Sequence, residues 1–184
     1  MKPFNWFTPK ISDTEYAPKF QAVLHVIKPY FDIIHDVPKM DDTDDWEPIM
    51  AWLAQRLTDH LAGLTQAHNA LVDVKPRRQL MGLHRALVKA AKAYGWALKD
   101  RADADRAILD DALYHRHSHH IKHGRQWDAL TRRYSKDLVR HLDKLSASAP
   151  ETYALIIGDD QLIEGLADFA DDDISGGSII QWDS

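Results

Sequence analysis

Histidine side chains concentrate in one short stretch of this sequence. Of the 11 histidines in the 184-residue chain, five lie between residues 115 and 123, and His119 and His123 are four residues apart. On a helix this spacing places two imidazoles on one face, one turn apart, where both can coordinate one metal ion. The pair is therefore a candidate site for Zn²⁺ or another divalent transition metal.

A third imidazole for such a site would come from another helix. The apolar periodicity places His60 on the apolar face of an early predicted helix, and a bundle can bring that face to His119 and His123. Trp52 and His60, taken with the later segment 119–126, resemble the metal-binding pattern of DinB-like helical bundles, with Gly and Arg in reversed order. The resemblance implies one early imidazole and a later pair. A histidine on an apolar face is also often a hydrogen-bonded core residue, so both interpretations stay open.

A basic stretch overlaps the histidine cluster. Residues 115–144 carry eight Lys or Arg and three acids. Along a helix these side chains form a stripe that can bind a nucleic-acid backbone or an acidic protein surface, unless acidic segments of the same molecule neutralise it. The arginines that we select as candidate partner-binding residues are Arg116, Arg125, Arg132 and Arg133.

One arginine of this stretch also carries a resemblance. Arg116 and His123 are similar to the Arg-x(4–6)-His motif of HEPN ribonucleases, which are all-helical. The resemblance implies that the two side chains cleave RNA at a dimer interface. A chain this rich in Arg and His produces the spacing by chance as well.

Two acidic segments balance the basic stretch. Residues 36–47 have a net charge of −5, and residues 159–184 have eight acids and no base. Asp171, Asp172 and Asp173 resemble the first half of a calcium-binding loop, but the twelfth position lacks the required bidentate Glu. We therefore take these three aspartates as candidate contacts to a basic partner.

Several classes of site are absent from the sequence. There is no Cys, no apolar run of the roughly 20 residues that span a membrane, and no glycine-rich phosphate loop. The first residues lack a signal-peptide pattern, so we expect a cytoplasmic protein. These absences and the segregated charge favour a non-enzymatic helical binding protein of the inhibitor, immunity or adaptor type, with another protein as its partner. The alternatives are a metal-binding bundle, possibly a metal-dependent hydrolase, and a nucleic-acid-binding or HEPN-like protein.

The elements that must position these residues are helices. Apolar residues recur at spacings of three and four along most of the chain. We expect one all-α domain over 1–184: an up-and-down antiparallel bundle of four to five long helices at about 14–146, and two short C-terminal helices within 148–184. The expected helices cover about 14–34, 46–73, 77–99, 101–123, 125–146, 149–157 and 159–170.

Four predicted boundaries define the surroundings of the histidine cluster and of the C-terminal helices. Asp100 is expected to cap the helix over 101–123, and Gly124 is expected to end it. The cluster would then continue the apolar face of that helix at its carboxyl end. Residues 148–151 read as a capping box that opens the next helix, and Gly158 should end it.

Overall fold

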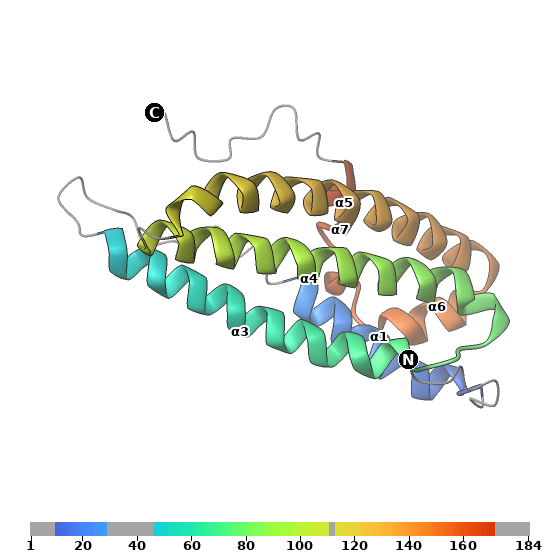
Figure 1. Cartoon of the computed structure of the whole chain (residues 1–184). Helices are drawn as coiled ribbons and strands as arrows, with labels where there is room; N and C mark the ends of the chain where they lie inside the picture. Colours follow the sequence, from blue (N-terminus) through green and yellow to red (C-terminus); the bar gives the residue numbers. More distant parts are fainter. Residues whose placement is uncertain (1–9, 29–45, 111–112, 172–184) are drawn as a thin grey trace, which may run out of the picture.

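The computed structural model describes residues 10–28, 46–110 and 113–171, and nearly all of these residues are helical (Figure 1). The described α-helices are α1 (Asp13–Ile27), α3 (Trp46–Val72), α4 (Met81–Leu109), α5 (His117–Ser148), α6 (Pro150–Ile157) and α7 (Leu166–Asp171). Short 3-10 turns occupy Arg78–Leu80, Tyr114–Arg116 and Asp160–Leu162. The expected all-α bundle is confirmed, with three long helices and several shorter ones. None of the described helices is long and apolar enough to cross a membrane.

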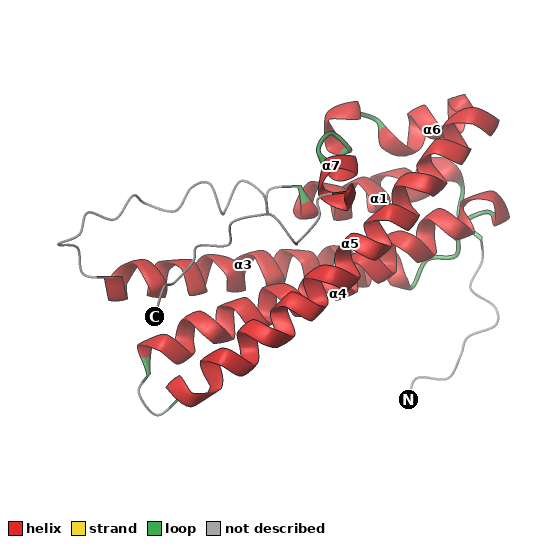
Figure 2. Cartoon of the chain, turned by 90° about the horizontal axis from the view of Figure 1, so that it is seen from above, coloured by secondary structure: helices red, strands yellow, loops and turns green. Residues whose placement is uncertain are grey.

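The three long helices lie side by side, each antiparallel to the next (Figures 1 and 2). α4 and α5 form a helical hairpin whose seam runs from Trp96 and Trp127, with ring centroids 5.9 Å apart, to Gly82, which lies under the His141 ring. Gly124 faces Asp100 in the same seam. The buried residues of α5 from Thr131 to Leu145 recur at alternating spacings of four and three, which is typical of a coiled-coil seam.

α1 and α6 close the core on the half of the bundle away from the α4–α5 turn (Figure 2). Tyr16 and Phe20 of α1 are fully buried, as is Ile156 of α6. The Gln21 side-chain amide donates to the carbonyl oxygens of Leu155 and Ile156, at 3.3 and 3.2 Å. Burial and these two hydrogen bonds fix α6 against α1.

The predicted break at residue 100 is wrong. α4 continues through Asp100 to Leu109, and α5 begins at His117 after the 3-10 turn at Tyr114–Arg116. Asp110 directly follows the last turn of α4, where the helix dipole disfavours negative charge. Asp110 has an extended backbone, with φ −125° and ψ 107°, and ends the helix.

The predicted stop at Gly124 is also wrong. Gly124 is buried inside α5, and a Cβ at this position would lie 3.8 Å from the Asp100 Cβ and 3.9 Å from the Arg101 Cγ. These are ordinary van der Waals distances, so a Cβ would fit, and packing against α4 keeps α5 helical despite the helix-propensity cost of glycine, about 1 kcal/mol. The histidine cluster therefore opens α5 and does not close the preceding helix.

Of the two boundaries predicted for α6, the structure confirms the end and contradicts the cap at the start. The predicted capping box is wrong, because the Ser148 hydroxyl donates to the Lys144 carbonyl oxygen at 2.7 Å and α6 starts with Pro150 and no side-chain cap. Gly158 ends α6 as expected, with φ +70°. Three predicted features lie outside the described residues. They are the part of the first predicted helix beyond Lys28, the acidic residues up to 45, and the pair Asp172 and Asp173.

Candidate functional site

Two carboxylates and one imidazole meet at the α4–α5 turn end of the hairpin. Asp100 and Asp103 are three residues apart on α4 and share a face. His120 lies in the first turn of α5, which runs back along that face. One donor atom from each of the three residues lies within 4.8 Å of the other two. His120 Nδ1 is 3.2 Å from the Asp100 carboxylate.

The fold holds these three residues in place through several neighbouring contacts. The His117 ring lies 3.2 Å from the Ala104 carbonyl oxygen and fixes the start of α5. Arg101 of α4 forms a 2.6 Å ion pair with Asp128 of α5 on the other side of the seam. Asp100 is 8% exposed, so the cluster lies at the edge of the buried seam.

Basic residues of the same helix neutralise part of this negative charge. The Asp103 carboxylate accepts from Lys99 Nζ at 2.6 Å and from Arg106 Nη1 at 3.3 Å. Lys99 and Arg106 side chains are 50% and 47% exposed, so both pairs are of the weak surface kind. The cluster is therefore an ion-pair network within the molecule. Another cation can displace Lys99 and Arg106 from the Asp103 carboxylate.

Asp105 adds a buried carboxyl group one turn from Arg101. Burial raises the pKa of Asp105 to about 6, and the charges of Arg101 and Arg106 oppose that rise without cancelling it. Its Oδ2 atom is buried with no hydrogen-bond partner. This end of α4 thus has a carboxylate oxygen, Asp105 Oδ2, that accepts no hydrogen bond.

The donor set fits a divalent transition metal. Zn²⁺ binds nitrogen and carboxylate oxygen at roughly 2.0–2.2 Å, so neighbouring ligands in a tetrahedral shell are about 3.4 Å apart. The 3.2 Å between His120 Nδ1 and Asp100 Oδ1 is close to that spacing. Mixed carboxylate and imidazole ligands suit Zn²⁺, Mn²⁺ and Fe²⁺.

The structure brings together two of the three predicted metal-binding histidines. The rings of His119 and His123 lie 4.1 Å apart between centroids on one face of α5. His60 lies on α3, where its Nε2 is 3.5 Å from the Tyr94 hydroxyl, and burial lowers its pKa. Within the described ranges His60 does not form a three-donor group with His119 and His123. The contact with Tyr94 matches the alternative of a hydrogen-bonded core histidine.

The predicted partner-binding arginines divide into two groups. Arg116, Arg125 and Arg133 are exposed, and their role in binding an acidic protein or nucleic acid stays a prediction. Arg132 donates to the Phe169 carbonyl oxygen at 3.1 Å, and its guanidinium lies 4.6 Å from the Phe169 ring centroid. Arg132 therefore fastens α7 to α5. Of the predicted acidic contacts, Asp171 ends α7, while Asp172 and Asp173 lie outside the described residues.

Asp100 and Asp103 are not among the predicted site residues, because the local sequence predicts a helix cap at Asp100. A signal was present in the small residues of α4. Buried alanines follow the seam before and after Asp100, and Ala93, Ala97 and Ala104 belong to this series. Such a stripe predicts one continuous helix packed closely on a neighbour, and it places Asp100 inside that contact.

Comparison with known proteins finds no relative of this chain. The resemblances to DinB-like bundles and to HEPN ribonucleases therefore rest only on the few residues that carry them. No family model, no curated protein and no solved structure matches this chain.

Proposed function

We propose that this helical bundle binds a divalent transition-metal ion at the α4–α5 turn end, through Asp100, Asp103 and His120. The observation that supports the proposal is the convergence of three donors from two helices within 4.8 Å of one another. Two carboxylates balance the charge of a dication, and the neutral imidazole supplies the nitrogen ligand. The bound ion would fasten the start of α5 to the end of α4.

The groups that now contact these donors are ones that a metal ion can displace. Lys99 and Arg106 hold Asp103 through exposed ion pairs, each worth at most about 1 kcal/mol. Asp100 and His120 are already in contact and need only small shifts to share an ion. Because His120 must be neutral to coordinate, metal affinity should fall as the pH is lowered.

The proposed site also limits what chemistry the ion could support. Three protein ligands leave a fourth position for water, as in catalytic zinc sites, whereas structural sites are closed by a fourth protein ligand. His119 is a further imidazole beside the site, with its ring centroid 5.8 Å from that of His120. The proposal is metal binding, and hydrolysis is a second question that arises only once an ion is found.

The test is Zn²⁺ binding by tag-free protein that has never contacted a nickel column and has been dialysed against a chelator. Calorimetry should show about one equivalent bound, and thermal unfolding should shift to higher temperature with Zn²⁺. Asp100→Asn and His120→Gln should each abolish tight binding. Both substitutions keep approximate size and hydrogen-bonding capacity, so circular dichroism should show an intact fold.

The matched control is the double variant His119→Gln/His123→Gln, which removes two imidazoles of the same helix. It should keep the Zn²⁺ stoichiometry of the unmodified chain. If the double variant loses the ion while Asp100→Asn keeps it, the site belongs to the His119/His123 pair and our assignment is wrong. Absence of Zn²⁺, Mn²⁺ and Fe²⁺ binding in the folded, unmodified chain would reduce the cluster to an ion-pair network.

A further inference from the structure

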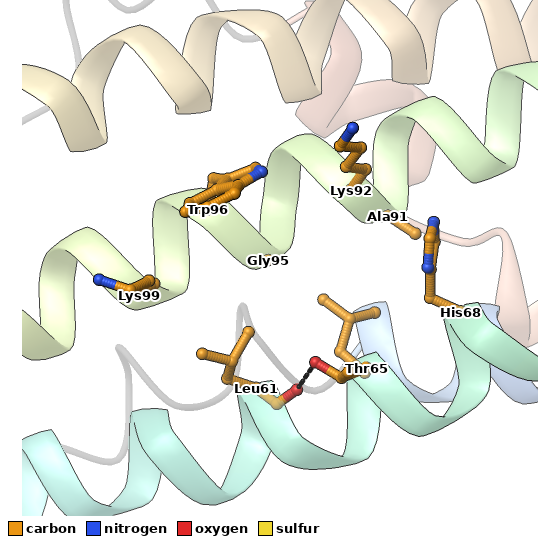
Figure 3. A pocket seen from close by; sticks show the side chains of 9 residues that line it. Leu61, Thr65, His68, Ala91, Lys92, Gly95, Trp96 and Lys99 are labelled. Atoms are coloured by element: carbon orange, nitrogen blue, oxygen red, sulfur yellow. Dashed lines mark hydrogen bonds between the residues drawn. The ribbon is translucent and has the colours of Figure 1, made fainter. Parts of the chain in front are cut away.

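A groove between α3 and α4 lies outside the proposed metal site. It has a volume of about 210 Å³, and α3 lines one side while α4 lines the other (Figure 3). Leu61, Leu64 and Gly95 form an apolar floor in its middle. Because α3 and α4 are antiparallel, His68 and Lys92 line one end of the groove, whereas Lys99 lies at the other, and the Lys92 ammonium points away from α3 (Figure 3).

The middle of the groove has the shape of a site for a flat apolar group. Gly95 has no side chain, and a Cβ there would make ordinary van der Waals contacts with Leu61 Cδ1 at 3.5 Å and Leu64 Cδ2 at 3.6 Å, so these three residues form one continuous apolar floor. Trp96 forms one wall and is 43% exposed. Its indole stacks on Trp127 with an interplanar angle of 22°, which fixes its orientation. A planar ring can therefore contact a wall that is already held in place.

The two ends of the groove differ in the charge that they offer. Lys99 donates to Asp103 at 2.6 Å and is already paired. No ion pair involves Lys92 among the residues that the structure describes, and its side chain is exposed. The positive charge available to an anion is therefore at the Lys92 end.

A histidine at the same end has an unsatisfied polar atom. The imidazole of His68 projects from α3 toward α4 beside Ala91 (Figure 3). Its Nε2 atom is covered and has no hydrogen-bond partner. A buried polar atom without a partner costs about 1–3 kcal/mol, so a small turn of the ring toward an acceptor in the groove is favoured. The exposed Lys92 side chain can turn toward α3, and His68 and Lys92 can then bind one acidic group together.

We propose that this groove binds a small aromatic anion. Its ring lies over Gly95 against Trp96, and its phosphate or carboxylate contacts Lys92 and His68. The combination of an apolar body site with a few convergent polar groups is typical of small-molecule pockets, and the hydrogen bond from Lys92 is charge-assisted. The proposal uses none of the three metal donors, so it stands independently of the metal site.

Phenyl phosphate is a suitable probe because it joins one ring to one dianion. Calorimetry in chelator-containing buffer should show saturable binding at one site, with a change in tryptophan fluorescence that Trp96→Phe removes. Inorganic phosphate and phenol, which each supply half of the interactions, should bind at least about tenfold more weakly. Benzoate tests whether a carboxylate serves as well as a phosphate.

Two pairs of variants locate the anion and the ring. Lys92→Met should weaken phenyl phosphate binding by about tenfold or more, whereas Lys99→Met, on the same helix face, should change it less than about twofold. Gly95→Ala places a methyl group on the floor and should weaken binding several-fold. Gly63→Ala makes the same change on α3, where no atom lies within 4 Å of the added Cβ, and should have no effect.

The outcomes separate a built site from general attraction to basic residues. Equal weakening by Lys92→Met and Lys99→Met, or by Gly95→Ala and Gly63→Ala, would overturn the proposal. So would inorganic phosphate binding as tightly as phenyl phosphate, since the ring would then contribute nothing. A folded chain that shows no saturable phenyl phosphate or benzoate binding would overturn it as well.

Discussion

The two ends of the bundle are held together by different physical means. At the end that α1 and α6 cover, the apolar end, Tyr16, Phe20, Leu87 and Ile156 are buried with 0% exposure. At the α4–α5 turn, the polar end, the helices meet through Asp100, Asp103 and His120 and through the Arg101–Asp128 ion pair. Burial of apolar area is non-directional and tolerant of small shifts, whereas charged contacts require defined geometry. The polar end is therefore the part suited to recognition, and the apolar end supplies the stability that allows it.

The largest expected effect comes from the apolar end. Phe20→Ala removes a fully buried ring and should lower the free energy of unfolding by about 3–5 kcal/mol. Leu155→Ala, on α6 but 40% exposed, should lower it by less than about 1 kcal/mol. Urea denaturation followed by circular dichroism measures both. Similar losses for the two variants would mean that α1 and α6 do not form a close-packed core.

The next effect concerns the ion pair at the polar end. The Arg101 and Asp128 side chains are 29% and 15% exposed, so Arg101→Met leaves a partly buried carboxylate without its partner. We expect a loss of about 1–3 kcal/mol. Arg140→Met breaks an exposed pair with Asp137, with exposures of 63% and 43%, and should cost less than about 1 kcal/mol. A double-mutant cycle of Arg101 with Asp128 that gives no coupling energy would contradict this expectation.

Asp105 should give the polar end its own pH dependence. Its pKa rises from 3.8 in the unfolded chain to about 6 in the folded one, so the folded state retains a proton that the unfolded state releases. Stability therefore falls as the pH rises from about 4 to about 6. In chelator-containing buffer at pH 7.5, Asp105→Asn should be more stable than the unmodified chain by about 1–3 kcal/mol. That gain should vanish near pH 4, and Asn at the exposed Asp73 should show neither effect.

His84 should give the apolar end a pH dependence of the opposite sign. Burial, helped by the charge of Arg85, lowers the pKa of His84 below its ordinary value of 6.5. The unfolded chain therefore takes up a proton first, and stability falls as the pH drops through 6.5. His84→Gln should reduce this slope, whereas Gln at the exposed His25 should leave it unchanged. An unchanged slope in His84→Gln would mean that the ring is protonated inside the fold.

The difference between the apolar end and the polar end also explains which features could be predicted from the sequence. Apolar periodicity predicted the all-α bundle, α3 and the burial of Phe20, because hydrophobic spacing records which face is buried. The predicted helix boundaries were wrong at the polar end, where Asp100 and Gly124 have strong local preferences for helix ends. Packing between α4 and α5 overrides those preferences, and nothing local in the sequence reports it.

The candidate site was predictable in one part only. The spacing of His119 and His123 is local to one helix, so their close approach followed from the sequence. The meeting of Asp100 and Asp103 with His120 depends on where the chain turns and on the register of the two helices. A helix break predicted at residue 100, where α4 in fact continues to Leu109, gives the hairpin a wrong register.

The contact between α1 and α6 has a consequence for how the chain assembles during synthesis. Gln21 and the carbonyl groups of Leu155 and Ile156 are 134 and 135 residues apart, whereas α4 and α5 are consecutive helices. On the ribosome α4 and α5 can pair as soon as both have emerged. α1 emerges far earlier but must wait for α6, which leaves part of its apolar face open for most of translation. The N-terminal helix is thus the segment most in need of protection before the chain is complete.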